Sequence, residues 1–243
     1  MSAAFLEARD LWRTFGGVAA VAGVDFTLAQ GELRCLIGAN GAGKSTFFRM
    51  LTGQLAPTRG RIRLKGHDIT GRAPFEVARL GVGIKTQVPS LFEGLPVAEN
   101  LWLAARRAQG ARRADAVTAE LLEELRLARV ADAEVGTLSH GQRQWVELGM
   151  VLAADPELLL LDEPAAGMTS DEVEATVALI ERLRGRRTLV IVEHDMHFVR
   201  RIAEKVTVLH RGRVLVEDTM DSILSNPAVR EAYLGSRAGG LDG

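Results

Sequence analysis

The sequence predicts an α/β fold built on a mainly parallel sheet, and three observations support this. Apolar runs such as LLLL at 158–161 and LVIV at 189–192 fit strands that are buried on both faces, as in parallel sheets. Helical patterns at 171–185 and 196–205 alternate with these runs, as in strand–helix–strand units. Residues 88–153 carry amphipathic helical patterns instead, which indicates an inserted helical lobe.

The remaining elements follow in chain order. Up to about residue 35 we expect short strands with turns at Gly16-Gly17 and Gln30-Gly31. Segment 31–38 is predicted to be a strand that runs into a glycine-rich loop. Further elements are predicted as a helix at 44–53, a strand at 61–69, helices at 97–108, 115–130 and 144–154, and strands at 157–163, 187–194 and 206–217.

Length and composition fit a single domain over 1–236, with a core of 1–87 and 154–236, the lobe at 88–153, and a disordered tail at 237–243. The formal net charge of −1 gives no bulk electrostatic reason to bind nucleic acid. A single cysteine, Cys35, excludes an internal disulfide and a cysteine zinc cluster. No signal peptide or membrane-length apolar run is found, so we expect a cytoplasmic chain.

A phosphate-binding loop is the first motif that carries chemistry. GANGAGKS, residues 38–45, has the spacing G-x-x-x-x-G-K-[ST] and lies between a predicted strand and a predicted helix. Its glycines let backbone N–H groups close around a β-phosphate. Lys44 is then placed to reach the β and γ oxygens, and the Ser45 hydroxyl to bind Mg²⁺.

Acidic and polar residues follow two of the predicted buried strands. Asp162 ends the LLLL strand, where it could hold Mg²⁺ through water, and Glu163 could act as general base on the attacking water. His194 follows the LVIV strand and could hydrogen-bond a γ-phosphate. Gln87 is a neutral amide where the core meets the lobe, and alone it is best interpreted as a solvated loop residue.

The stretch TLSHGQRQWVELGM, residues 137–150, sets Ser139 beside His140. A hydrolase nucleophile elbow needs G-x-S-x-G, but Thr137 stands two residues before the serine. Adjacent residues on a helix also point in different directions, so the two side chains should not form a catalytic pair. Ser139 and Gln142 have the S-x-x-Q spacing of a capping box instead, which predicts a helix start and hence an anion-binding end.

Together these residues make the chain resemble the ATP-binding cassette (ABC) ATPases over nearly its whole length. The motifs occur in the family's order: Phe15 at the position that stacks on adenine, GANGAGKST (38–46) as Walker A, Gln87 as Q-loop, LSHGQ (138–142) as signature, LLLLDEP (158–164) as Walker B, AAGMT (165–169) as D-loop, and His194 as switch histidine.

The resemblance implies a P-loop NTPase core with an N-terminal antiparallel β subdomain, and ATP hydrolysis with Mg²⁺. It implies Glu163 and His194 as catalytic residues and Ser45, Gln87 and Asp162 at the metal. The nucleotide-binding set that it implies is Phe15, Asn40, Gly41, Gly43, Lys44, Ser45, Thr46, Gln87, Ser139, Gly141 and Gln142.

The resemblance also implies partners. In this family two cassettes pair head to tail, so that the signature helix of one faces the γ-phosphate on the other. The expected partners are a second, related ABC ATPase subunit, two membrane permease subunits at the cytoplasmic face of the inner membrane, and indirectly a solute-binding protein. No nucleic acid is expected.

Two positions depart from the family pattern: His140 stands where glycine is usual, and Thr169 where Asp or Asn is usual. We expect His140 to line the signature turn without a chemical role. The local sequences AAGM, LSHGQRQWVELGM, VEHDMHFV and VTVLHRGRVLVE resemble the ATP-binding subunit of urea importers, which are close kin of branched-chain amino acid importer subunits.

Other functions remain open at this stage. Branched-chain amino acids or short amides are alternative solutes. Soluble ABC ATPases of DNA repair or translation carry long coiled-coil insertions or two cassettes, whereas this lobe spans only 88–153 and there is one phosphate loop. A nucleoside kinase or GTPase would leave LSHGQ and His194 unexplained.

Overall fold

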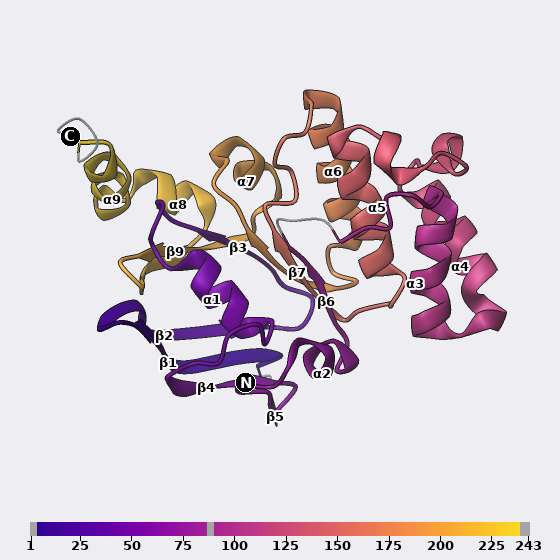
Figure 1. The fold of residues 1–243 in the computed structure, drawn as a ribbon. Coiled ribbons are helices and arrows are strands. Elements are labelled where there is room, and N and C mark those ends of the chain that lie inside the picture. Colours follow the sequence, from indigo (N-terminus) through magenta and orange to yellow (C-terminus); the bar gives the residue numbers. More distant parts are fainter. Residues whose placement is uncertain (1–3, 87–89, 239–243) are drawn as a thin grey trace. The chain divides into compact units, whose positions relative to one another are not determined.

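The computed structural model describes residues 4–86 and 90–238 and divides the chain into two compact units. Unit 1 comprises Met1–Leu80 and Leu183–Gly243, and unit 2 comprises Gly81–Arg182. The predicted α/β class is confirmed, with an antiparallel β sheet, mainly parallel strands and a helical lobe. Figure 1 labels the helices and most of the strands.

The N-terminal strands of unit 1 form an antiparallel sheet in the order β2-β1-β4-β5. Its central strands are joined by a two-glycine turn whose residues have positive φ (52° at Gly16 and 88° at Gly17), the geometry that a tight hairpin needs. The two strands are longer than the short strands predicted. The bounds of all four strands of this sheet are β1 Leu6–Phe15, β2 Val18–Leu28, β4 Arg59–Leu64 and β5 His67–Asp68.

The second group of strands in unit 1 has the order β10-β9-β3-β8. β3 (Leu33–Ile37) runs parallel to β8 (Thr188–Val192) on one side and to β9 (Lys205–His210) on the other. β10 (Arg213–Asp218) turns back antiparallel to β9. Every residue of β3 and β8 is buried, which confirms that the continuous apolar run at 189–192 belongs to a buried parallel strand.

Helix α1 (Lys44–Leu51) packs against β2 and β8, and Figure 1 shows it between the antiparallel sheet and the parallel strands of unit 1. Its Phe47 ring meets Phe26 of β2 edge-on, with ring centroids 5.4 Å apart. This aromatic contact ties the helix that follows the glycine-rich loop to the antiparallel sheet. The other helices of unit 1 are α2 Pro74–Arg79, α7 Met196–Ile202, α8 Met220–Ser225 and α9 Pro227–Ala238.

Unit 2 contains one parallel strand pair and the helical lobe. β6 (Val82–Lys85) lies beside β7 (Leu158–Asp162). The predicted helix at 115–130 is wrong at both ends: α4 starts after Gly110 and ends where Arg126 adopts a left-handed backbone (φ 56°). The helices are α3 Val97–Gln109, α4 Ala111–Glu124, α5 His140–Leu152 and α6 Ser170–Leu183, with short 3₁₀ turns at Ala128–Val130 and Val135–Thr137.

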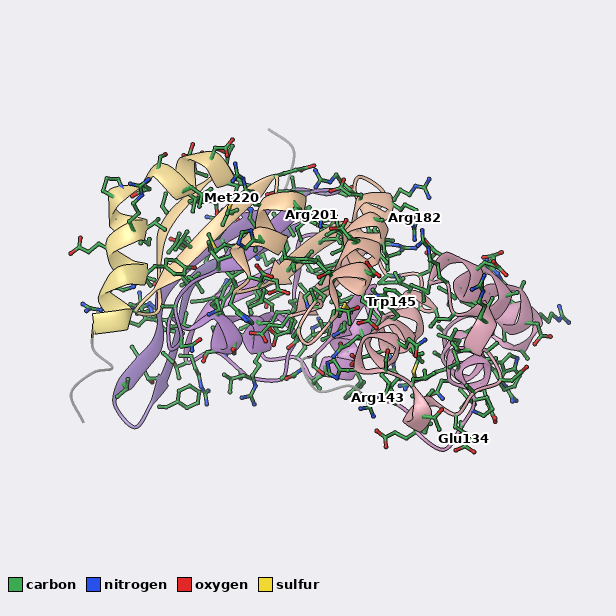
Figure 2. All side chains as sticks on the ribbon, turned by 90° about the horizontal axis from the view of Figure 1, so that it is seen from above. Glu134, Arg143, Trp145, Arg182, Arg201 and Met220 are labelled. Atoms are coloured by element: carbon green, nitrogen blue, oxygen red, sulfur yellow. The ribbon has the colours of Figure 1, made fainter. Side chains whose placement is uncertain are left out.

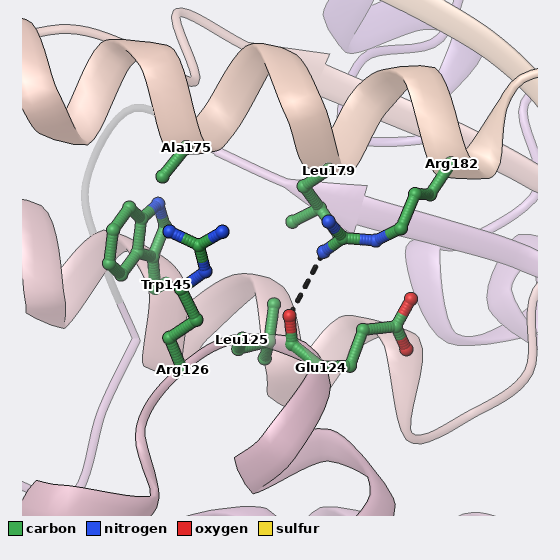
Figure 3. Close-up of a pocket in the computed structure, with 7 residues that line it drawn as sticks. All are labelled: Glu124, Leu125, Arg126, Trp145, Ala175, Leu179 and Arg182. Carbon is green, nitrogen blue, oxygen red and sulfur yellow. Dashed lines mark hydrogen bonds between the residues drawn. The ribbon is translucent and has the colours of Figure 1, made fainter.

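Side-chain hydrogen bonds connect α6 to its neighbours within unit 2. Trp145 of α5, labelled in Figure 2, donates from Nε1 to Thr176 Oγ1 at 3.0 Å. Arg182 of α6 donates to the Glu124 carbonyl at 3.0 Å, as Figure 3 shows. The pocket around these residues has a volume of about 10 Å³, which is room for about one water molecule. It is a packing feature and not a ligand site.

No helix in the described ranges 4–86 and 90–238 is long and apolar enough to cross a bilayer.

A buried ion pair joins β6 to α5. Lys85 Nζ lies 3.4 Å from Glu147 Oε2, and both side chains are nearly inaccessible, at 1% and 7% exposure. Burial raises the pKa of Glu147, while the positive charge of Lys85 partly lowers it again. Each charge therefore depends on the other, because an isolated buried charge is strongly disfavoured.

Replacing Lys85 with methionine should destabilise the protein by about 3–5 kcal/mol, because Glu147 would stay buried without its cation. The double variant Lys85→Met/Glu147→Leu should regain most of this loss, since an apolar pair of similar volume is often tolerated. Denaturant unfolding of the three proteins measures both effects. A double variant as unstable as the single one would show that the pair is required for another reason.

Candidate functional site

The phosphate loop joins β3 to α1 and rests on backbone from two other segments of unit 1. A Cβ atom on Gly43 (φ 101°) would lie 2.4 Å from the Ala20 carbonyl oxygen, so only glycine fits there. Gly212 N, in the β9–β10 turn, donates to Ala42 O at 2.9 Å, and Ala22 N donates to Gly212 O at 2.8 Å. Backbone hydrogen bonds that involve two other segments thus hold the loop in place.

Lys44 begins α1 and lies over the loop. Its Nζ donates to Gly38 O at 2.6 Å and to Ala39 O at 3.2 Å, and the side chain is 9% exposed. Ser45 is exposed and Thr46 half-buried in the first turn of the helix. A lysine held by loop carbonyls at the N-terminal end of a helix makes a site suited to phosphate oxygens. Asn40 and Gly41, at the exposed tip, complete the predicted loop set.

Phe15 ends β1 and is 47% exposed, which is high for a phenylalanine. The Arg13 guanidinium lies 4.7 Å from the centre of its ring. An exposed aromatic ring can stack on a flat group, on the face that Arg13 does not cover. This is the property expected of the residue at the adenine position.

His194 lies in the turn between β8 and α7, and its side chain is 61% exposed. The turn is organised from below by the buried Glu193, whose Oε2 accepts from the backbone N of His194 at 3.0 Å and of Asp195 at 3.4 Å. Asp195 then caps α7 by accepting from His197 N at 2.8 Å. Sequence reasoning named only His194, although the two acids beside it shape the turn.

The acidic pair lies in unit 2, at the carboxyl end of β7. Asp162 is the last residue of the strand and is half-buried. Glu163 follows in a left-handed backbone conformation (φ 47°), which is uncommon for a side chain of this size and typical of functional sites. Gln87 lies outside the described residues. The predicted site residues thus fall into two sets, with the phosphate loop, Phe15 and His194 in unit 1 and the acidic pair with the signature in unit 2.

The predicted capping box at the signature is confirmed. Ser139 Oγ accepts from Gln142 N at 3.2 Å, and Ser139 N donates to Gln142 Oε1 at 3.1 Å, so α5 begins at His140. The Ser139 hydroxyl donates to Glu172 Oε1 at 3.0 Å. His140 Nε2 lies 3.2 Å from the Ala166 carbonyl oxygen. The two side chains have different partners, which agrees with the rejection of a Ser–His pair.

Glu172 is the site residue that sequence reasoning missed. It also accepts from Thr169 N at 2.9 Å, and Thr169 Oγ1 accepts from Glu172 N at 3.4 Å, which together form a second capping box at the start of α6. The T-x-x-E spacing at 169–172 was a signal for this cap. Nothing in that spacing indicated the contact with Ser139.

Within the described residues no group of three or more His, Cys, Asp or Glu side chains is arranged to hold a metal ion. The ligands predicted for Mg²⁺ are of another kind: the Ser45 hydroxyl, the Gln87 amide and the single carboxylate of Asp162. Mg²⁺ commonly binds through one or two carboxylates together with substrate phosphates and water. Such a donor set fits Mg²⁺ that arrives with a nucleotide.

Comparison with known proteins agrees with this geometry. Residues 21–166, more than half of the chain, match the family model described as ABC transporter. The chain belongs to the ABC transporter ATPases. ATP hydrolysis is the activity of this family, and ATP is the nucleotide it binds. Residues 213–239 of this ABC ATPase also match a model described as branched-chain amino acid ATP-binding cassette transporter.

Several curated relatives of this ABC ATPase are transport subunits. It is 37% identical to the high-affinity branched-chain amino acid transport ATP-binding protein BraF of Pseudomonas aeruginosa, over 97% of this chain and 99% of BraF. It is 35% identical to LivG of Escherichia coli, with the same coverage. It is also 36% identical to the lipopolysaccharide export system ATP-binding protein LptB of Acidithiobacillus ferridurans, over 96% of this chain and 97% of LptB.

Solved structures show the same fold. The ABC transporter cassette MJ1267 in its ADP conformation superposes with a TM-score of 0.86 at 27% identity, covering 96% of this chain and all of that one. The cassette MJ0796, solved as a dimer bound to ADP and phosphate, gives a TM-score of 0.78 at 25% identity, covering 88% of this chain and 98% of that one.

Proposed function

We propose that this ABC ATPase is the motor subunit of an importer that takes up urea across the cytoplasmic membrane. The observation that supports urea is the local sequence of four segments, among them LSHGQRQWVELGM around the signature and VEHDMHFV around His194. Both segments lie next to the nucleotide chemistry, so the inference rests on subfamily likeness and not on contact with the solute. The chain itself would act on ATP alone.

In the proposed site, the phosphate loop binds the nucleotide and Lys44 leaves its loop carbonyls to meet the β and γ oxygens. Phe15 stacks on the adenine. Ser45, Gln87 and Asp162 would hold Mg²⁺, which neutralises charge on the phosphates when bound. Lys44 is already at the loop, so this motion needs a change of partner and no rearrangement of the backbone.

Glu163 is proposed to accept the proton of the attacking water, and His194 to hydrogen-bond the γ-phosphate. Glu163 has a left-handed backbone (φ 47°) directly after the end of β7. His194 is exposed, and its backbone N–H donates to the carboxylate of the buried Glu193 at 3.0 Å. The backbone at both positions therefore has a defined geometry, which supports a positioned role for the two side chains.

The working form is proposed to be a head-to-tail dimer with a related cassette, as the dimeric state of MJ0796 illustrates. The signature residues Ser139, Gly141 and Gln142 would then face the γ-phosphate bound by the partner cassette. The dimer would sit at the cytoplasmic face of the membrane on two permease subunits, and a solute-binding protein would deliver the solute from the other side.

Branched-chain amino acid import is the second candidate, and the comparisons carry it. BraF and LivG are both named for this transport, and the C-terminal match at 213–239 has the same description. The relation to LptB, an export-system subunit, shows that likeness over the whole chain extends to cassettes with other roles. Direct measurement of uptake is needed to separate the solutes.

The solute is tested by uptake in the native host with Glu163→Gln introduced into this chain. Accumulation of labelled urea at low external concentration should fall by roughly 90% or more, because loss of the general base costs about 10²–10⁴-fold in rate. Leucine uptake should be unchanged and serves as the control. The reverse pattern, loss of leucine uptake with urea uptake intact, would assign the branched-chain amino acid alternative.

The two site variants Lys44→Ala and Glu163→Gln should separate binding from hydrolysis. Lys44→Ala removes the principal cation at the phosphates and should abolish tight ATP binding. Glu163→Gln keeps the shape of the side chain and should bind ATP normally while turnover falls about 10²-fold or more. Nucleotide affinity and ATPase rate are measured for both. An equal loss of affinity in the two variants would make Glu163 a structural acid.

The loop at the start of the helical lobe is proposed as the permease-docking surface. Asn100 is fully buried and holds the loop backbone: its Oδ1 accepts from Phe92 N at 2.9 Å, and its Nδ2 donates to Phe92 O at 3.1 Å. The Phe92 side chain nevertheless remains 54% exposed, and Leu91 and Leu95 are half-buried beside it. A fixed backbone with an outward aromatic side chain suits a partner interface.

Phe92→Ser should therefore leave the melting temperature of the isolated subunit within a few degrees and weaken its assembly with the permease. Phe75→Ser is the matched control, because Phe75 on α2 is 55% exposed and belongs to unit 1. Assembly is measured by co-purification from native membranes. A large fall in melting temperature for Phe92→Ser, with assembly intact, would mean that the side chain stabilises the lobe instead.

A further inference from the structure

The carboxylate of Glu172 lies between the signature and the D-loop of the same chain. Ser139 Oγ donates to its Oε1 at 3.0 Å. Thr169 donates to its Oε2 twice, from the backbone N at 2.9 Å and from Oγ1 at 3.0 Å. Three donors thus converge on one side chain, and one of them is the hydroxyl that the proposed function assigns to a nucleotide phosphate.

The absence of a side chain at Gly141 makes this contact possible. A Cβ atom there would lie 2.2 Å from the Glu172 carboxyl carbon and 2.3 Å and 2.4 Å from its oxygens. The carboxylate therefore lies against Gly141 in the first turn of α5, at the end of the helix that carries a partial positive charge. The hydrogen bonds from Thr169 and Ser139 lower the pKa of Glu172, so it is an anion at neutral pH.

We propose that Glu172 is a positioning residue that occupies the signature's anion site in the nucleotide-free chain and must release Ser139 before a phosphate can bind there. This inference rests on the proposed role of the signature in a head-to-tail dimer. It adds that the Glu172 carboxylate competes with the phosphate for Ser139. This competition sets how readily the dimer closes on ATP.

The Ser139 hydroxyl cannot donate to Glu172 and to a phosphate oxygen at the same time. Its hydroxyl has one proton, and its oxygen already accepts from Gln142 N. Donation to Glu172 therefore prevents donation to a phosphate oxygen. Two anions also repel one another at the same helix end, so an arriving phosphate favours withdrawal of the carboxylate.

Release of Ser139 leaves Glu172 with partners. Its second oxygen keeps the two hydrogen bonds from Thr169, so the cap of α6 survives the exchange. The D-loop that precedes Thr169 also contacts the signature through His140, whose Nε2 lies 3.2 Å from Ala166 O. Displacement of the Glu172 carboxylate would thus affect the contacts at the start of α6 and those of the D-loop.

The test uses the full chain in the Glu163→Gln background, in which bound ATP persists. The dissociation constant of the dimer at saturating Mg-ATP is measured by analytical ultracentrifugation, together with the melting temperature. Glu172→Gln keeps a capping-box side chain and removes the charge. It should lower the dissociation constant by roughly threefold to tenfold, since the phosphate would then meet no anion at the helix end.

Two further variants isolate the cause. Asp171→Asn makes the same change of charge in the same helical turn and should leave dimerisation within about twofold of the parent. Glu172→Asp keeps the charge but shortens the side chain, so it should also tighten the dimer by withdrawing the carboxylate from Ser139. It also provides a second variant for the same test if Glu172→Gln folds poorly.

The outcomes separate the competitor from the proposed dimer. A tighter dimer with both Glu172 variants and not with Asp171→Asn supports the proposal. An unchanged or weaker dimer with both Glu172 variants overturns it, and would mean that the carboxylate holds Ser139 ready for the phosphate. A parent protein that never dimerises with ATP shows that two copies of this chain do not pair head to tail and overturns this inference, separately from the proposed pairing with a related cassette.

Discussion

The close packing of the phosphate loop against backbone atoms of β2 is the constraint on which the nucleotide-binding half of this protein depends. Gly43 leaves no room for a Cβ above the Ala20 carbonyl, and Gly212 of the β9–β10 turn is hydrogen-bonded to both the loop and β2. Backbone N–H groups can face a phosphate only if the loop is supported from the other side. Two segments distant from the loop in sequence, β2 and the β9–β10 turn, supply this support.

Unit 2 uses a similar device for the signature. Gly141 leaves room for the Glu172 carboxylate, just as Gly43 leaves room for a carbonyl. The two departures from the family pattern also find structural explanations. His140 packs against the D-loop, where its Cδ2 lies 3.0 Å from the place of a Cβ on Gly167. Thr169 caps α6, a role that Asp or Asn could also fill. Neither residue needs a chemical role to account for its contacts.

Much of the fold followed from the sequence because it depends on local pattern. The apolar runs at 158–161 and 189–192 are buried parallel strands, and the Ser139–Gln142 capping box opens a helix as predicted. The end of α4 did not follow, because Arg126 adopts a left-handed conformation that its residue type does not signal. The sequence pattern also predicted no role for Glu193, whose carboxylate accepts a hydrogen bond from the backbone N–H of the next residue.

By itself the sequence determined the strand–helix order, the phosphate loop, the acidic strand end and the family, since each depends on residues adjacent or regularly spaced in the chain. Only the tertiary structure decided which distant side chains meet: Lys85 with Glu147, and Ser139 with Glu172, 33 residues apart. Capping and hydrophobic periodicity act over a few residues, whereas the pairing of buried or converging charges depends on how whole elements pack, which no local pattern encodes.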